Sequence, residues 1–430
     1  MRVLVIGGGA REHAVVARLG ADRDVGELVC APGNPGIARL ARTIPCDISN
    51  PDAVLDIAER EQIDFTVVGP ELPLSVGIAD RFAAAGRLLF GPTAAAARLE
   101  SSKAFAKAFM ARYGVPTARF HTSETLDDAL RVVRSEEFGW PVVLKADGLA
   151  SGKGVVIADD RQIAEAAIFA AMQDRKFGAA GDRLVIEECL SGPEVSFFAV
   201  SDGARAVPIG SAQDHKRIFD DDRGPNTGGM GAFAPSPLID GDSALEHRVM
   251  REIVQPVIAG MAREGHPFRG FLFVGLMITA AGPKVIEFNV RLGDPETQAM
   301  LTLIDEPLVP ILVGGATGEL RQSSIRIGRD SVVGVVMASR GYPESAESGR
   351  IISGVEAAEM IPGVAVYHAG TARRDGNLVT AGGRVLTVAG RGADFVEAIT
   401  RAYAGVMQIS FDGMQYRRDI GRKALAHEPL

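Results

Sequence analysis

The chain has 430 residues, of which 47% are hydrophobic and 23% charged, and its formal net charge is −8 at pH 7. This length predicts roughly two to four domains of an ordinary globular protein. The acidic balance argues against a nucleic-acid partner, three scattered cysteines argue against a disulfide framework, and no apolar run approaches the roughly 20 residues of a membrane span. Because Met1 leads directly into an apolar strand without a signal peptide, we expect a cytoplasmic protein.

Residues 1–101 predict a doubly wound α/β domain with a parallel sheet. Four short apolar runs alternate with helical patterns, and each run ends in a glycine or proline turn. The expected strands are residues 3–6, 28–30, 65–68 and 88–90. In open parallel sheets, ligands bind beyond the carboxyl ends of the strands, where these turns gather. We therefore expect a ligand site at this edge of the sheet.

The first turn, Gly7-Gly8-Gly9, stands between a strand and a helix, as in dinucleotide-binding proteins. The third glycine of G-x-G-x-x-G would fall at position 12, which is Glu12, and no acidic residue closes the second strand. The sequence thus argues against a nicotinamide or flavin cofactor. Two interpretations of the glycines stay open: a phosphate of a smaller ligand at the helix N-terminus, or tight packing of the strand against the helix.

Residues 102–191 contain a glycine-rich segment between two apolar runs, the first ending at Lys145 and the second at 155–157. It is not a Walker A loop, because Gly148 and Gly152-Lys153 are one residue too close and a strand follows instead of a helix. The pattern predicts a β-hairpin whose tip folds over a triphosphate, with Lys145 pointing in from its strand. A mobile surface hairpin with solvated lysines is the alternative.

Two further polar segments each allow two interpretations. The apolar strand within 184–194 ends in acidic residues, which can meet a purine and a ribose or simply be solvated. The run Gln213-Asp214-His215-Lys216-Arg217 stands close in sequence to a glycine-rich loop at 225–231. Such a charge cluster is usually a solvated face, but between core strands it can bind an anionic substrate.

Residues 283–296 carry the most informative pattern of the chain. Glu287, Asn289 and Arg291 follow a short apolar strand at a spacing of two, which places all three on one side of it. A carboxylate and an amide oxygen can hold a Mg²⁺ ion that also binds substrate phosphates, and a guanidinium can bind a carboxylate or a phosphate. The alternative is an edge strand with polar residues on its solvent-exposed face. Against it, the run continues into Gly293-Asp294-Pro295-Glu296, which adds two acidic residues at a tight turn. The sequence therefore predicts a metal–phosphate site.

Residues 324–430 predict a small α+β domain, with strands near 332–338 and 383–388 and a helix near 395–404. This part contains no comparable polar cluster, so we expect it to support the others, although Gly370-Thr371 and Gly382-Gly383 can approach a ligand.

The chain resembles the ATP-grasp superfamily in three features: two mixed α/β lobes, a lysine-flanked glycine hairpin and a Glu-x-Asn strand. Over the whole chain, the sequence resembles the glycinamide ribonucleotide synthetase family of phosphoribosylamine–glycine ligases. The motifs that carry this resemblance are Arg11-Glu12-His13-Ala14, Gly69-Pro70-Glu71, the Lys145 segment, Gln213-Asp214-His215-Lys216-Arg217, the glycine-rich loop ending at Gly231, and Glu287-Phe288-Asn289. The resemblance implies a multidomain α/β and α+β fold. It would have an N-terminal Rossmann-like (pre-ATP-grasp) substrate domain at 1–101, a two-lobed ATP-grasp domain at 102–323 with its small hairpin lobe at about 120–191, and the C-terminal domain at 324–430.

The resemblance also implies the chemistry. ATP, glycine and 5-phosphoribosylamine would give glycinamide ribonucleotide, ADP and phosphate through glycyl phosphate, in de novo purine biosynthesis. Phosphoryl transfer depends mainly on positioning and on neutralising charge. We expect no covalent enzyme intermediate, because no nucleophile–base pair is evident. We also expect a monomer with small-molecule partners only.

The residue roles implied by the resemblance are as follows. Mg²⁺ or Mn²⁺ would be held by Glu287 and Asn289. ATP would be bound by Lys103, Lys145, Lys153, Glu187, Glu188, Leu190 and Glu194. The catalytic residues would be Arg291, Lys216 and Asp214. The substrates would be bound by Gly9, Glu12, Glu71, Asp214, His215, Lys216, Arg291 and Asp294.

Two other functions are compatible with part of this pattern. Another ATP-grasp carboxylate–amine ligase would share Lys145, Glu287 and Asn289 but would not need the motifs at 213–217 and 227–231. A nucleotide-binding module without ligase activity is the second alternative, and the intact metal ligands and lysines count against it.

Overall fold

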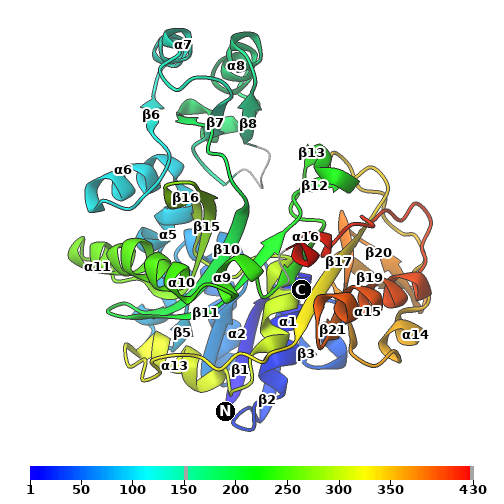
Figure 1. Cartoon of the computed structure of the whole chain (residues 1–430). Helices are drawn as coiled ribbons and strands as arrows, with labels where there is room; N and C mark the ends of the chain where they lie inside the picture. The colour runs from blue at the N-terminus through cyan, green and yellow to red at the C-terminus, as the bar shows by residue number, and fades with distance from the viewer. Residues whose placement is uncertain (150–153, 427–430) are drawn as a thin grey trace.

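The computed structural model of the chain describes residues 1–149 and 154–426. Figure 1 shows their arrangement: a parallel sheet at the N-terminus, a large antiparallel sheet beside it, and a small lobe that projects from the rest.

The N-terminal sheet is parallel and has the strand order β3-β2-β1-β4-β5. Its strands are β1 (Arg2–Gly7), β2 (Glu27–Pro32), β3 (Arg42–Thr43), β4 (Phe65–Val68) and β5 (Leu89–Phe90). Its helices are α1 (Ala10–Gly20), α2 (Pro51–Arg60), α3 (Glu71–Ser75), α4 (Ile78–Ala84) and α5 (Ala94–Ser101). The four predicted strands are confirmed. The sequence did not predict β3, because two residues are too short to show a periodic pattern.

The small lobe is a four-stranded antiparallel sheet of order β6-β9-β7-β8. It contains β6 (Phe120–Ser123), β7 (Val142–Ala146), β8 (Val155–Ala158) and β9 (Leu184–Glu188), with α7 (Leu126–Ser135) and α8 (Arg161–Ile168) packed on it. Lys145 on β7 pairs with Val155 on β8, so the predicted hairpin is confirmed. The predicted ATP ligand Lys153 lies outside the described residues.

The large sheet is antiparallel throughout and has the order β16-β15-β10-β11-β14-β17-β21-β18. Its strands are β10 (Glu194–Asp202), β11 (Ala206–Asp214), β14 (Gly231–Ala234), β15 (Arg269–Thr279), β16 (Gly282–Asn289), β17 (Ser331–Ala338), β18 (Val364–His368) and β21 (Arg384–Gly392). Two small ribbons accompany it, β12 (Arg217–Phe219) with β13 (Arg223–Asn226), and β19 (Thr371–Arg374) with β20 (Asn377–Thr380).

The remaining helices flank this sheet. They are α6 (Lys103–Tyr113), α9 (Pro237–Asp240), α10 (Ser243–Val249), α11 (Gln255–Arg263), α12 (Glu296–Met300), α13 (Val309–Thr317), α14 (Val355–Glu359), α15 (Phe395–Gln408) and α16 (Arg422–Leu425). Capping explains where α6 starts and stops: the Ser102 hydroxyl accepts the Phe105 N–H at 3.1 Å, and Gly114 closes the helix at φ +67°.

The parts of the chain share sheets and cores. β14 pairs with β17, so the large sheet runs across position 323 without a break. Leu4 and Ile6 of the N-terminal sheet lie in one buried cluster with Phe197, Leu272 and Phe288 of the large sheet. This packing brings the carboxyl ends of the N-terminal strands next to the end of β16. The domain limits at 101 and 323 stay predictions.

Candidate active site

A bulge in β16 shapes the predicted metal face. Gly275 of β15 pairs with Glu287, whereas the next residue, Leu276, pairs with Val285, so Ile286 is the extra residue. A bulged residue leaves the ladder, and here its carbonyl accepts the Lys145 ammonium at 3.0 Å. Glu287 and Asn289 follow the bulge at a spacing of two and share one face, as predicted. The bulge therefore joins the small-lobe lysine to the metal face.

Four cationic side chains surround Glu287. Burial acts to raise the pKa of this carboxyl, but the charges of Lys216, Lys145, Lys103 and Arg291 outweigh it and hold the pKa below its usual value. Glu287 is therefore ionised at neutral pH, as a metal ligand must be. The cations come from β7, from the start of α6, from the segment after β11 and from the turn after β16.

Arg291 lies two residues beyond β16 and is held by two carboxylates. Its Nη2 donates to Glu100 Oε1 at 2.9 Å and to Asn289 Oδ1 at 3.3 Å, and its Nε donates to Glu71 Oε2 at 3.3 Å. Glu100, at the end of α5, also accepts the Val290 N–H at 2.8 Å. Burial raises the pKa of Glu100 against the opposing charge of Arg291. Nothing in the local pattern indicates this role, because Glu100 lies near the end of an alanine-rich helix.

Asp214 and Lys216 form a second charged group at the end of β11. Lys216 Nζ pairs with Glu194 Oε2 at 2.6 Å, and the carboxylates of Asp214 and Glu194 hold the pKa of Lys216 above its usual value although burial opposes this. Burial raises the pKa of Asp214 to about 7 despite the nearby Lys216, and Glu296 adds to the rise. Glu296, which was not predicted as a site residue, is buried and accepts the Ser196 hydroxyl at 3.0 Å.

Glu187 lies buried between two lysines. Its Oε1 is 3.0 Å from Lys145 Nζ, and its Oε2 is 2.8 Å from Lys107 Nζ. Burial lowers the pKa of Lys107 to about 8 even though Glu187 opposes this shift. Glu187 was predicted to bind ATP, and the structure places it where it orients Lys145. Lys103 lies at the start of α6, where its Nζ donates to Gly148 O at 3.0 Å.

The segment after β9 offers several free backbone donors among the described residues, and the N–H of Leu190 is one of them. The Glu188 carboxylate is engaged with Arg119, which donates to it through its backbone N–H at 3.0 Å and its Nε at 2.8 Å. These bonds and Lys284 lower the pKa of Glu188 to about 2, although burial opposes them. Over residues 1–149 and 154–426, the Leu190 N–H has no protein acceptor. A purine edge could accept that bond, as predicted.

Glu12 has a structural task in the first turn. Its Oε2 accepts the Gly9 N–H at 2.6 Å, and its Oε1 pairs with Arg11 Nε at 2.6 Å. A Cβ on Gly7 or Gly69 would overlap the Glu12 side chain. Tight packing therefore explains Gly7, and the carboxylate that replaces the third glycine fills the space between two strand ends.

Gly9 lies close to Asp294, which is bound by a residue from the C-terminal part. A Cβ on Gly9 would lie 3.8 Å from Asp294 Oδ2. Arg384 Nη2 pairs with the same oxygen at 2.8 Å, while its Nη1 donates to Asp294 O at 2.7 Å and to Gly228 O at 2.6 Å. Arg384 was not among the predicted site residues, and the signal for it was the neighbouring Gly382-Gly383.

His215 points away from Asp214 and Lys216, on the other side of the strand end. Its ring is 1% exposed, lies 5.9 Å from the ring of Phe233, and has no hydrogen-bond partner among the described residues. Burial, followed by the charges of Lys423 and Arg417, lowers the pKa of His215 to about 4. The structure thus does not bring His215 together with the other predicted substrate residues.

Because His215 is buried and its pKa is lowered, we expect the folded protein to lose stability in mild acid. Between pH 6.5 and 4 the unfolded chain binds a proton that folded His215 does not, so the free energy of unfolding falls as the pH falls through this window. The loss from His215 is up to about 3 kcal/mol. We expect His215→Gln to reduce the pH dependence of urea unfolding over this range without abolishing it, because the buried His13 and His368 also have lowered pKa values. Exposed His266→Gln should leave the pH dependence unchanged. An unchanged slope in His215→Gln would contradict the assignment.

The predicted metal face presents two side-chain oxygen groups, the carboxylate of Glu287 and the amide of Asn289. No group of three His, Cys, Asp or Glu side chains able to hold a metal was found within the described residues. Glu287 and Asn289 alone suit an ion that keeps several waters and takes substrate phosphates as its other ligands, as Mg²⁺ does. The residues therefore fit a divalent ion that arrives with a nucleotide.

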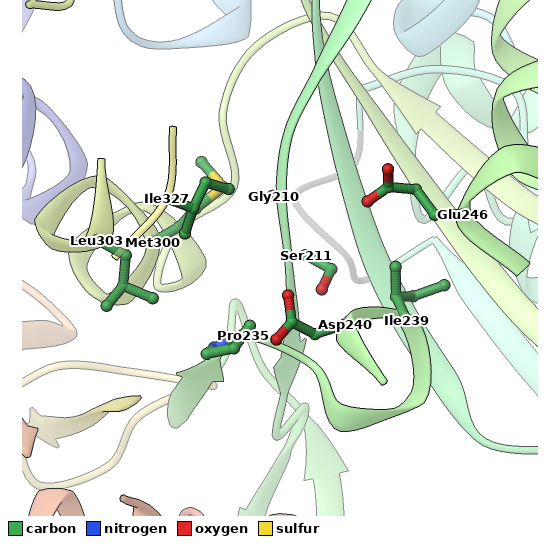
Figure 2. Close-up of a pocket in the computed structure, with 9 residues that line it drawn as sticks. All are labelled: Gly210, Ser211, Pro235, Ile239, Asp240, Glu246, Met300, Leu303 and Ile327. Carbon is green, nitrogen blue, oxygen red and sulfur yellow. The ribbon is translucent and has the colours of Figure 1, made fainter. Parts of the chain in front are cut away.

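A small cavity lies elsewhere, between β11 and α12 (Figure 2). It has a volume of about 30 Å³ and is lined by Asp240 and Glu246 among others, whose pKa values are raised by burial. This volume can hold water but no nucleotide, and none of the predicted site residues lines it.

Comparison with known proteins decides the family. Models of phosphoribosylglycinamide synthetase match the chain in three consecutive parts, the N domain at 1–100, the ATP-grasp (A) domain at 101–297 and the C domain at 332–423. A phosphoribosylamine–glycine ligase of Xylella fastidiosa (strain Temecula1) is 49% identical over 432 residues, covering 100% of this chain and 99% of its own. The chain belongs to the phosphoribosylglycinamide synthetase family. The resemblance drawn from the motifs is thus confirmed.

Solved structures agree with this membership. The crystal structure of a phosphoribosylamine–glycine ligase from Thermotoga maritima has a TM-score of 0.83 at 35% identity, covering 97% of this chain and 100% of its own. A biotin carboxylase from Campylobacter jejuni has a TM-score of 0.72 at 15% identity, covering 96% and 92%, and shares the fold alone. Members of the phosphoribosylglycinamide synthetase family are ATP-dependent ligases with an ATP-grasp domain and a divalent metal ion, and this chain is one of them. The predicted fold class and enzyme class are confirmed. Among the described helices, none is long and apolar enough to cross a membrane.

Proposed function

We propose that this chain joins glycine to 5-phosphoribosylamine in purine biosynthesis, giving glycinamide ribonucleotide while ATP becomes ADP and phosphate. The observation that carries this proposal is the convergence of Lys103, Lys145, Lys216 and Arg291 on Glu287 in a member of this family. Several cations beside a carboxylate and an amide oxygen suit a triphosphate with its metal ion and a substrate carboxylate.

The first half-reaction moves the γ-phosphoryl group onto the glycine carboxylate. Glu287 and Asn289 would hold Mg²⁺ or Mn²⁺, which neutralises charge on the phosphates. Lys145 and Lys103 would face the phosphate oxygens. Arg291, oriented by Glu71 and Glu100, would bind the glycine carboxylate or the phosphoryl group in transfer. Positioning and charge neutralisation are what this kind of transfer requires.

In the second half-reaction, the amine of phosphoribosylamine attacks the carbonyl carbon of glycyl phosphate and phosphate leaves. The attacking nitrogen must lose a proton. Asp214, whose pKa is about 7, is suited to accept it, and Lys216 would neutralise the departing phosphate. The phosphoribosyl group would lie beside Gly9 and Asp294, where Arg384 brings the C-terminal part to the site.

The nucleotide would lie between the lobes. Its adenine would accept the Leu190 N–H, and Glu194 would bind the ribose. Lys153, which lies outside the described residues, would add a further positive charge for ATP. We also propose that the chain acts as a monomer in the cytoplasm.

The decisive test is ADP release by the purified chain with ATP, Mg²⁺ and freshly generated phosphoribosylamine, with and without glycine. ADP formation that needs both glycine and the amine supports the proposal. ADP formation with neither would indicate a different ATP-grasp ligase, and ATP binding without any turnover would indicate a nucleotide-binding module.

Lys145→Met is expected to weaken ATP binding by about tenfold or more, because one buried charge pair to phosphate contributes about 1.5–3 kcal/mol. Calorimetric titration with a non-hydrolysable ATP analogue and Mg²⁺ measures this. Lys176→Met is the control, because Lys176 is an exposed lysine of the same lobe. If Lys145→Met binds the ATP analogue with wild-type affinity, Lys145 does not contact the nucleotide.

A further inference from the structure

His13, in the Arg11-Glu12-His13-Ala14 motif, has no role in the chemistry above. It lies on α1 and is 5% exposed. Its Nδ1 accepts the backbone N–H of His368, the last residue of β18, at 2.8 Å. An acceptor at Nδ1 requires a neutral ring with its proton on Nε2. Burial, followed by the nearby His368, lowers the pKa of His13 to about 3, which keeps the ring neutral.

Asn34 bonds the other side of His368. Its side-chain NH₂ donates to His368 O at 2.7 Å and to Gly8 O at 2.9 Å. Its Oδ1 accepts the N–H groups of Gly36 and Ile37, each at 2.9 Å. Both donors and both acceptor positions of the amide are thus used. Two turns of the N-terminal sheet, Gly7-Gly8-Gly9 and residues 33–36, are joined through the end of a C-terminal strand.

The contact leaves no free space. A Cβ on Gly8 would lie 2.6 Å from Gly33 O. A Cβ on Gly36 would lie 2.5 Å from His13 Cε1 and 2.6 Å from His368 Cδ2. The two turns are therefore packed against each other, and the second turn is packed against the rings of His13 and His368.

We propose that His13 and Asn34 are positioning residues that fix the two turns against β18 in the shape that receives the phosphoribosyl group. This inference rests on the proposed function, which places that group beside Gly9. Glu187, Lys145 and Lys107 belong to a separate network in and beside the small lobe. Loosening the turns should therefore affect the phosphoribosyl ligand and spare ATP.

The test measures two affinities in the full chain by calorimetry, for glycinamide ribonucleotide and for a non-hydrolysable ATP analogue with Mg²⁺. His13→Leu removes the acceptor, and Asn34→Asp removes both donors. Each should weaken glycinamide ribonucleotide binding about tenfold and leave ATP-analogue binding within about twofold. His13→Asn, whose amide oxygen can replace Nδ1, should restore most of the affinity.

Arg39→Ala is the matched control. The side chain of Arg39 pairs with Glu359 at 3.0 and 2.8 Å, an ion pair between the same two parts of the chain, and makes no hydrogen bond to the described residues of the turns. It should leave both affinities unchanged. If His13→Leu fails to fold, the two ligand affinities of Asn34→Asp and His13→Asn decide whether the inference holds.

Two results would overturn the inference. One is unchanged product affinity in the folded variants. The other is an equal loss for both ligands, which would indicate general packing. Absence of product binding by the wild-type chain would instead overturn the proposed function.

Discussion

Glu287→Gln is expected to lower turnover by at least about 10³-fold, because a metal ion contributes several kcal/mol of charge stabilisation to phosphoryl transfer. Glutamine keeps the shape of the side chain but removes the negative charge that binds the ion. The four nearby cations would then lose one of their counter-charges, which disfavours a metal ion at this position. The fold should persist, because the side chain is only partly buried and the substitution is isosteric.

The measurement is the initial rate of ADP release over a titration of Mg²⁺ and of Mn²⁺, together with the thermal unfolding midpoint. Glu252→Gln, the same change at a helix glutamate paired with Arg248, is the control and should behave as wild type. Near-normal turnover in Glu287→Gln would remove the proposed metal site. A large fall in the unfolding midpoint would show that the loss of rate reflects unfolding.

Arg291→Lys is expected to lower kcat/KM for glycine by about 10²–10³-fold, the range found when one donor to a developing charge is removed. Lysine keeps the positive charge. A single ammonium cannot reproduce the planar fork that reaches Glu71, Glu100 and Asn289 at once. The charge would therefore remain while the orientation is lost.

Steady-state kinetics with varied glycine test this, with ATP-analogue affinity measured in parallel and expected to stay within about threefold of wild type. The control is Arg205→Lys, because Arg205 donates to the carbonyls of Leu320 and Gln322. If Arg291→Lys raises the KM for ATP as much as that for glycine, Arg291 serves the nucleotide instead. An unchanged kcat/KM would remove it from the site.

Both predictions depend on networks of charged and polar side chains. Some partners in these networks are neighbours in the sequence, and others are far apart. Asn289 and Arg291 are two residues apart, but Arg291 and Glu100 are 191 apart. A substitution at Glu100 should therefore act on catalysis through Arg291, although nothing in its own helix suggests a functional residue.

The sequence by itself determined the local features of this protein. Strand and helix periodicity placed β1, β2, β4 and β5 to within about two residues, and the spacing of two in β16 placed Glu287 and Asn289 on one face. The glycine-rich segment after Lys145 predicted the β7–β8 hairpin. These features depend on neighbours in the chain, and residue types report them directly.

Only the tertiary structure decided which distant groups meet. Four features of the structure have no local signature in the sequence. They are the bulge at Ile286, the Glu100–Arg291 pair, the Arg384 contacts with Asp294 and Gly228, and the joining of β14 to β17. Each arises because segments far apart in the chain pack into shared sheets and cores, and the free energy of that packing selects contacts between residues tens to hundreds of positions apart. The chemistry of the site could be inferred from single residues, whereas the orientation of each residue depends on a partner elsewhere in the chain.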